Sequence, residues 1–227
     1  TSPPLALVSA IIICFLIAGV THVACTRSVR SAIAVVAIIT IGSWAAEYLG
    51  LTFGLPFGTY VYAERLGPAV LGVPILVPLA WTMIAYPAIV LARRLSTDRV
   101  RGALTAGLVL AAWDLVLDPL MVKEGYWVWS ALGPAVAGVP ISNFFGWMAT
   151  GATLAFCVWP WLTVSPDNPP TDDRVPLALY GGSVLLMAAK CLTLGLPWIA
   201  LSGLIAAGIL VRCGMSRPQG DEQEWCG

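Results

Sequence analysis

The sequence has few charged residues and only one histidine, and both scarcities restrict what the protein can be. Charged residues make up 11% of its 227 positions, whereas a soluble domain carries about 25%. The formal net charge is zero, which leaves no basic surface for nucleic acid and no acidic tail. A lone His22 argues against zinc and di-iron chemistry, which usually need several histidines. We therefore expect no metal, no cofactor and no nucleic-acid partner.

The cysteines lack the spacing of a disulfide framework or a metal site. None of the six forms a C-x-x-C pair, and five lie in or at the ends of apolar segments. A free cysteine packs as a small apolar residue. We interpret all of them as small core residues, at Cys14, Cys25, Cys157, Cys191, Cys213 and Cys226.

Long apolar segments are what the sequence has in abundance. Hydrophobic residues make up 59% of the chain, more than one soluble core can bury. A helix that spans the roughly 30 Å apolar layer of a bilayer needs about 20 mostly apolar residues, and backbone in lipid must satisfy its hydrogen bonds internally. We expect an all-α membrane bundle of about seven transmembrane helices, at residues 5–24, 31–53, 71–92, 102–121, 139–163, 176–192 and 194–212. They form a single transmembrane domain over 1–212, and a polar tail follows over 213–227.

Basic residues are divided unevenly between the two sides of this bundle. Nine Lys and Arg residues fall on the side of the C-terminal tail, and three fall on the opposite side, Arg65, Lys123 and Lys190. By the positive-inside rule we expect the tail in the cytoplasm and the N-terminus outside.

The chain also resembles itself. A glycine and aromatic block recurs 67 residues later, so that Gly58, Tyr60 and Tyr62 match Gly125, Trp127 and Trp129. A second block, LGPAVxGVPI over 66–75, recurs over 132–141. The two repeat copies, about 31–92 and 102–163, are separated by an even number of spans and have the same orientation. We expect them to be related by a rotation about the membrane normal.

Three carboxyl groups in apolar sequence are the candidate catalytic residues. The repeat aligns Glu47 with Asp114, and Asp118 follows Asp114 by one helical turn, on the same helix face. An ionisable group inside a membrane is costly, so it usually faces the interior of the bundle and marks function. Structural roles stay open for all three, such as a helix cap for Glu47 or contacts with loop amides for Asp118. Pro119 predicts that the helix ends or kinks there.

These carboxyl groups and the aromatic residues near them suit carbocation chemistry on a lipid-soluble substrate. A carboxylic acid kept neutral by burial can protonate an alkene, aromatic faces stabilise the cation, and a second carboxylate can accept a proton from the attacking water. We expect Asp114 to be the acid and Glu47 or Asp118 the base. Candidate substrate-binding residues are Tyr60, Tyr62, Trp81, Trp113, Trp127, Trp129, Asn143 and Trp147, although the two tyrosines, Trp127 and Trp129 also fit an interfacial belt.

The connections 54–70 and 122–138 are rich in glycine, proline and aromatic residues. This composition is typical of fixed turns with apolar anchors. We expect both connections to be ordered and to cover the cavity.

Taken together, these motifs resemble a known family. In the first copy they are Glu47-Tyr-x-Gly50, Phe57-Gly58-x-Tyr60-x-Tyr62, Leu66-Gly67-Pro68, Gly72-Val73-Pro74 and Pro78-Leu-Ala-Trp81. In the second they are Asp114-x-x-x-Asp118-Pro119-x-Met121, Gly125-x-Trp127-x-Trp129, Gly138-Val139-Pro140 and Asn143-Phe144-x-Gly146-Trp147. Over roughly residues 40–160 the chain resembles the membrane carotenoid-biosynthesis family that includes the carotenoid 1,2-hydratases and the bisanhydrobacterioruberin hydratases of C50 pigments.

The resemblance implies a carotenoid hydratase in a bacterial or archaeal cell membrane. Such an enzyme adds water across the terminal C1=C2 bond of an acyclic (ψ-end) carotenoid and gives a tertiary alcohol. Its partners would be the carotenoid and membrane lipid, and association with other enzymes of the pathway stays open.

Three other functions remain open. Asp114-x-x-x-Asp118 looks like half of the diphosphate–magnesium site of a polyprenyl transferase, but few basic residues lie near it. Parallel repeats also occur in small transporters. A retinal or carotenoid protein would need a lysine in the middle of the last helix, whereas Lys190 falls at the end of the sixth.

Overall fold

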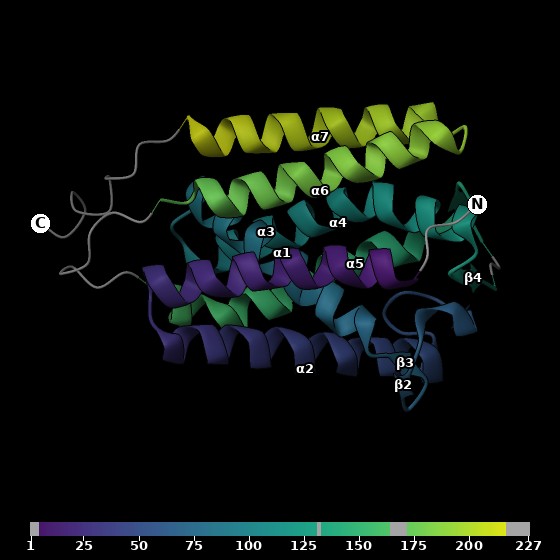
Figure 1. Cartoon of the computed structure of the whole chain (residues 1–227), viewed down its shortest axis with the longest axis horizontal. Helices are drawn as coiled ribbons and strands as arrows, with labels where there is room; N and C mark the ends of the chain where they lie inside the picture. Colours follow the sequence, from purple (N-terminus) through teal and green to yellow (C-terminus); the bar gives the residue numbers. More distant parts are fainter. Residues whose placement is uncertain (1–4, 131–132, 164–171, 217–227) are drawn as a thin grey trace, which may run out of the picture.

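The described part of the chain is a bundle of long helices (Figure 1). The computed structural model describes residues 5–130, 133–163 and 172–216. Within these ranges the helices are α1 (Leu5–Thr26), α2 (Val29–Phe53), α3 (Leu76–Leu95), α4 (Arg99–Glu124), α5 (Ile141–Val158), α6 (Arg174–Thr193) and α7 (Pro197–Met215). The 3-10 turn η2 (Trp159–Leu162) continues α5. All seven are long and apolar enough to cross a membrane, so the predicted all-α transmembrane bundle is confirmed.

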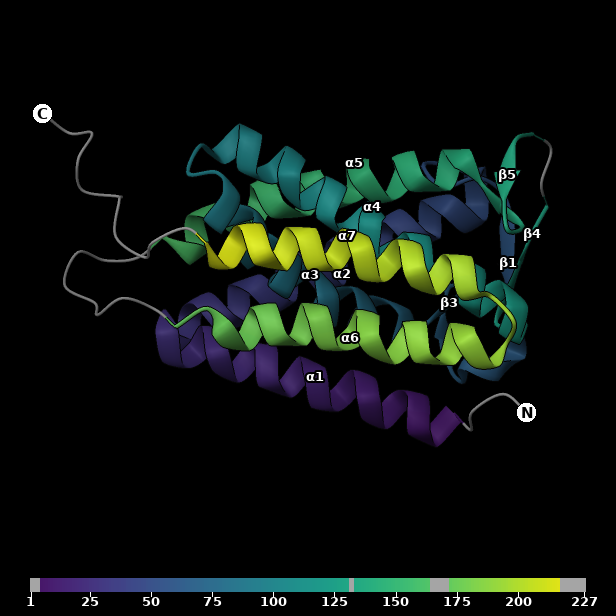
Figure 2. The same cartoon turned by 90° about the horizontal axis from the view of Figure 1, so that it is seen from above.

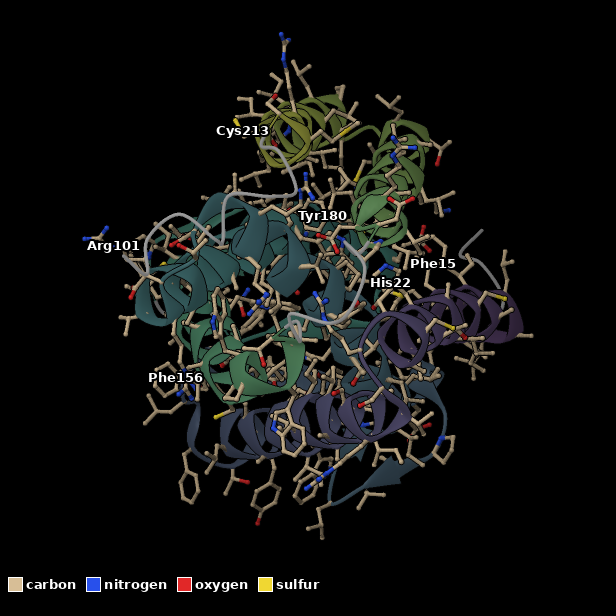
Figure 3. The ribbon with its side chains drawn as sticks, turned by 90° about the vertical axis from the view of Figure 1, so that its left-hand side faces the viewer. Phe15, His22, Arg101, Phe156, Tyr180 and Cys213 are labelled. Carbon is tan, nitrogen blue, oxygen red and sulfur yellow. The ribbon has the colours of Figure 1, made fainter. Side chains whose placement is uncertain are left out.

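Helix α3 lies at the centre and packs against α1, α2, α4 and α6. The closest helix pair is α4 with α5, and α7 packs against α6 and α4. Figure 2 shows α6 and α7 side by side on the face that is turned toward the viewer. Seen from one end, Tyr180 of α6 points into the bundle, whereas Cys213 of α7 and Arg101 of α4 point outward (Figure 3).

Aliphatic side chains cover the outside of the bundle. Ile17 of α1, Ile33 and Ile41 of α2, and Leu201 of α7 are all at least 59% exposed. A soluble protein avoids such continuous apolar surface, whereas lipid solvates it without cost. The surface and the seven apolar helices are those of an integral membrane protein.

The cysteines do not all lie in the core. Of the five described, only Cys191 is buried, and Cys14, Cys25, Cys157 and Cys213 are exposed; Cys226 lies outside the described residues. The prediction was wrong for these four because the outer face of a membrane helix is as apolar as its inner face. A small apolar thiol is therefore equally compatible with either face.

Two helix boundaries differ from those predicted. Helix α3 begins at Leu76 and not near 71, because the preceding residues pair as two short strands. Helix α4 runs through Pro119 and ends at Glu124, where Gly125, with φ of 73°, forms the cap. Proline removes only one backbone donor, and the buried residues that flank Pro119 hold the helix together.

Short strands connect the helices at one end of the bundle. In the first copy β2 (Ala69–Val70) pairs with β3 (Val73–Pro74), and in the second β5 (Ala135–Val136) pairs with β6 (Val139–Pro140). Both hairpins turn through two residues with positive φ, Leu71 and Gly72 in one and Ala137 and Gly138 in the other. A type I′ turn requires that geometry.

A third pairing joins the two copies directly. Strand β1 (Tyr60–Tyr62), which the 3-10 turn η1 (Glu64–Leu66) follows, pairs antiparallel with β4 (Trp127–Trp129). Val61 lies opposite Val128, and bonds from Ala63 N to Tyr126 O (2.8 Å) and from Ser130 N to Thr59 O (2.9 Å) flank the pair. Exchange of the copies at the 67-residue offset maps each of these bonds onto the other. The superposition of the helix pairs stays a prediction.

Candidate active site

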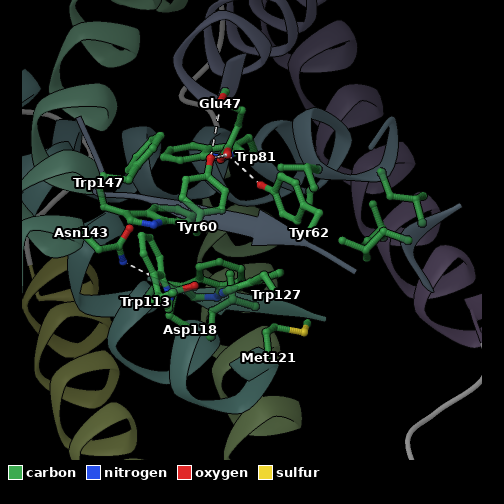
Figure 4. A pocket seen from close by; sticks show the side chains of 18 of the residues that line it. Glu47, Tyr60, Tyr62, Trp81, Trp113, Asp118, Met121, Trp127, Asn143 and Trp147 are labelled. Atoms are coloured by element: carbon green, nitrogen blue, oxygen red, sulfur yellow. Dashed lines mark hydrogen bonds between the residues drawn. The ribbon is translucent and has the colours of Figure 1, made fainter. Parts of the chain in front are cut away.

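A cavity lies beneath the β1–β4 ribbon, at the end of the bundle where the hairpins are (Figure 4). About 80 Å³ of it is accessible to the centres of water-sized molecules, several times the space that one water needs. Ten of the eleven residues predicted for the site line the cavity: Glu47, Asp118, Tyr60, Tyr62, Trp81, Trp113, Trp127, Trp129, Asn143 and Trp147. The eleventh, Asp114, is not among the lining residues.

The two connections predicted to cover the cavity contribute to its walls. Tyr60, Tyr62 and Leu66 come from the first connection, and Trp127 and Trp129 from the second. Residues 131–132 of the second connection lie outside the described residues. Strand pairing therefore brings both loops over one cavity.

Glu47 of α2 accepts hydrogen bonds from three side chains. The hydroxyl groups of Tyr60 and Tyr62 donate to Oε2, the latter at 2.7 Å, and Nε1 of Trp81 donates to Oε1 at 2.8 Å. The residue is only 5% exposed. Such donors satisfy a carboxylate that would otherwise be costly to bury.

Tyr60 and Tyr62 are suited to remain donors to Glu47. Burial raises the pKa of both phenols, and the charge of the nearby Glu47 carboxylate raises it further. Both hydroxyl groups therefore keep their protons at physiological pH.

Asp114 and Asp118 share one amide. Nδ2 of Asn143 donates to Oδ2 of Asp114 at 2.8 Å and also to Oδ2 of Asp118. One turn separates the two aspartates on α4, and the β5–β6 hairpin places Asn143 in the first turn of α5. All three residues are at most 3% exposed. A neutral amide cannot compensate two charges, so this group favours a single negative charge shared between two carboxyl groups.

The two aspartates differ in their access to the cavity. Asp118 lines it, and the indole of Trp127 points toward the Asp118 carboxyl (Figure 4). Asp114 lies behind Asn143, and its Oδ1 is buried without a hydrogen-bond partner among the described residues. Of the two aspartates, only Asp118 is therefore open to the cavity.

Aromatic rings form the inner wall. Trp81 and Trp147, which correspond in the two repeat copies, stack with their ring centroids 3.8 Å apart. The ring of Trp113 lies 6.0 Å from that of Trp147, and its Nε1 is held by Ser183 Oγ at 2.9 Å. Ring faces of this kind attract a positive charge.

The sequence does not predict that several other residues line the cavity. Val8 and Ile12 of α1 and Leu76 of α3 look like ordinary lipid-facing residues in sequence, yet they form one wall of the cavity. Met121, which follows Pro119 by two residues in the second copy, also lines the cavity. Among the described residues, no group of three or more His, Cys, Asp or Glu side chains is arranged to hold a metal ion.

Comparisons with known proteins identify a matching family and a curated relative. A profile of the family described as "Carotenoid biosynthesis protein" matches residues 7–210. The chain is 34% identical over 129 residues to a bisanhydrobacterioruberin hydratase of Haloarcula japonica. That match includes 54% of this chain and 43% of the relative, so the chain spans less than half the length of the curated relative. No solved structure matches this chain.

Proposed function

The chain belongs to the carotenoid biosynthesis protein family, and from this membership and its cavity we propose that it is a carotenoid hydratase. Water would add across the terminal C1=C2 bond of an acyclic carotenoid and give a tertiary alcohol. One observation carries the proposal. Two carboxyl groups in different surroundings, Glu47 with three donors and Asp118 beside a second carboxyl, face one cavity walled by aromatic rings.

Asp118 is the proton donor in this mechanism. Its carboxyl transfers a proton to C2, the electrons of the double bond form the new C2–H bond, and a tertiary cation remains at C1. The sequence suggested Asp114 for this role, but Asp114 does not line the cavity. Asp114 acts instead through Asn143, as a positioning residue that favours the protonated state of the pair.

The aromatic rings and Glu47 then act on the cation and on the water. The faces of Trp81, Trp113 and Trp147 stabilise the positive charge at C1. Water forms the new C–O bond at C1 and loses a proton to Glu47, which acts as general base. Transfer of that proton from Glu47 back to Asp118 resets the site, so the reaction consumes only water.

Expression in a lycopene-producing host with mass spectrometry of the pigments tests this function. We expect products heavier than lycopene by the mass of one or two water molecules. An inactive matched control, Asp118→Asn, should leave the pigment unchanged. Unaltered lycopene in cells whose membranes contain the wild-type protein would contradict the proposal.

The same experiment separates the competing functions. A polyprenyl transferase would add an isoprenoid unit, and a small transporter would leave every pigment mass unchanged. The position of Asn143 disfavours the transferase, because its amide N–H groups occupy the space between the two aspartates. A magnesium ion needs oxygen ligands in such a place.

A further inference from the structure

We propose that the carotenoid enters the cavity sideways from the membrane, through an aliphatic mouth between α1 and α4. The mouth consists of Val8, Ile12, Leu66, Leu76, Leu117 and Met121. This proposal rests on the proposed function, in which the terminal double bond of the carotenoid reacts. The structure indicates the path along which the rest of the carotenoid leaves the cavity.

The cavity has two chemically different ends. Its inner end contains both carboxyl groups, Asn143 and the stacked pair Trp81 and Trp147. Its other end, at the mouth, consists mainly of aliphatic side chains and a thioether, with Tyr62 beside them. In Figure 4, Tyr62 and Met121 lie toward α1, on the side away from Asn143 and Trp147. These two ends match a substrate that has a reactive end group and a long apolar chain.

Helices α1 and α4 pack on other helices more than on each other. Helix α1 packs on α2, α3 and α6, whereas α4 packs mainly on α5, α3 and α7, and α6 contacts both α1 and α4. Both views of the bundle show α1 and α6 diverging toward the end where the hairpins lie (Figures 1 and 2). Val8 and Met121 are half-buried there, as expected of residues at an entrance.

The route through the end of the bundle is closed, because the β1–β4 ribbon covers it. The repeat does not create a second mouth. At the 66-residue offset Leu76 and Val77 correspond to Ser142 and Asn143, so the second copy presents polar groups where the first presents aliphatic ones.

The size of the cavity requires an exit for the substrate. The accessible space of about 80 Å³ accommodates the end of an acyclic carotenoid but not its whole polyene. The remainder must pass the mouth and lie among the lipid chains. Flexible Met121 suits such a position because a thioether adapts its shape to different neighbours. The site therefore takes one end of a long apolar polyene at a time.

Variants that narrow the mouth test this path. In full-length protein purified from lycopene-producing cells, Ile12→Trp and Met121→Trp should reduce the retained lycopene and its hydration by about tenfold or more. Hydration of farnesol, a short isoprenoid with the same dimethyl-substituted double bond, should fall much less than hydration of lycopene, because less of its chain has to pass the mouth. Val8→Trp repeats the test at a half-exposed position. It replaces Ile12→Trp if the larger side chain at buried Ile12 disturbs folding.

Matched controls lie on the outward faces of the same helices. The controls are Ile13→Trp on α1 and Leu115→Trp on α4, at positions 44% and 37% exposed. They should not change the retention of lycopene or the hydration of either substrate. Two results for mouth variants of normal thermal stability would overturn the proposal. One is lycopene retention at the wild-type level, and the other is an equal loss of lycopene hydration and farnesol hydration. If the wild-type protein retains lycopene but hydrates neither substrate, the proposed function fails. The amount of lycopene retained by the mouth variants and by the wild type then still tests the entry path.

Discussion

At the scale of single residues, the roles of the two aspartates depend on which one reaches the cavity. Because Asp118 lines it, Asp118→Asn should lower kcat by about 10²–10⁴-fold, as expected for loss of a general acid. Asp114→Asn should lower kcat by about tenfold, the effect of one altered hydrogen bond to a charged or shared group, with KM and thermal stability unchanged. Rates of lycopene hydration by the purified variants measure both effects.

The comparison also has an outcome that reverses the assignment. A folded Asp114→Asn protein that is inactive, beside an Asp118→Asn protein that retains substantial activity, would make Asp114 the donor. Recovery of activity in Asp114→Glu, which restores a carboxyl group to Asn143, would support its positioning role.

A second prediction concerns the donors to Glu47. Tyr62→Phe removes the 2.7 Å hydrogen bond to Oε2 and leaves the ring in place. We expect kcat to fall by about ten- to a hundredfold, because a hydrogen bond to a charged group contributes about 1.5–3 kcal/mol. Tyr48→Phe is the matched control, since Tyr48 follows Glu47 on helix α2, stacks on Trp44 and does not line the cavity. Equal activity of the two variants would show that the hydrogen bond from Tyr62 to Glu47 does not contribute to catalysis.

At the scale of elements, the close crossing of α4 and α5 sets the distance between Asn143 and the two aspartates. A Cβ atom at Gly107 would lie 2.3 Å from the carbonyl oxygen of Met148, so only glycine permits this approach. Gly107→Ala should lower the free energy of unfolding by about 1–3 kcal/mol, seen as a lower Tm in detergent, and should also reduce activity.

Gly182→Ala on α6 provides the control for that substitution. No atom lies within 4 Å of a Cβ placed there, and alanine is the better helix residue by about 0.5–1 kcal/mol. We expect an unchanged or higher Tm. A similar decrease of Tm in both variants would show that the α4–α5 crossing tolerates a wider spacing.

At the scale of the whole molecule, the β1–β4 ribbon and the end of α7 at Met215 lie at opposite ends of the bundle (Figure 1). The excess of Lys and Arg lies on the side of the tail, so the ribbon and the cavity should face the outside of the cell. A green fluorescent protein fused to the C-terminus should therefore fluoresce, and alkaline phosphatase at the same place should be inactive. The reverse pattern would place the cavity on the cytoplasmic side.

Much of the architecture follows from local sequence. The length of each apolar segment determined the number of helices, because the thickness of a bilayer sets the length of a spanning helix. The repeat and the rarity of carboxyl groups in apolar sequence indicated the site residues, because an ionisable group in lipid persists only with a partner or a role.

Only the tertiary structure shows which of these residues line the cavity. Hydropathy cannot separate the inner from the outer face of a membrane helix, since lipid and core are equally apolar. It therefore does not predict that Val8 and Ile12 line the cavity or that four of the described cysteines are exposed. The choice between Asp114 and Asp118 depends on Asn143, which lies at least 25 residues away in sequence and is brought between them by the β5–β6 hairpin and the α4–α5 crossing. Contacts of that range depend on packing, which no local pattern encodes.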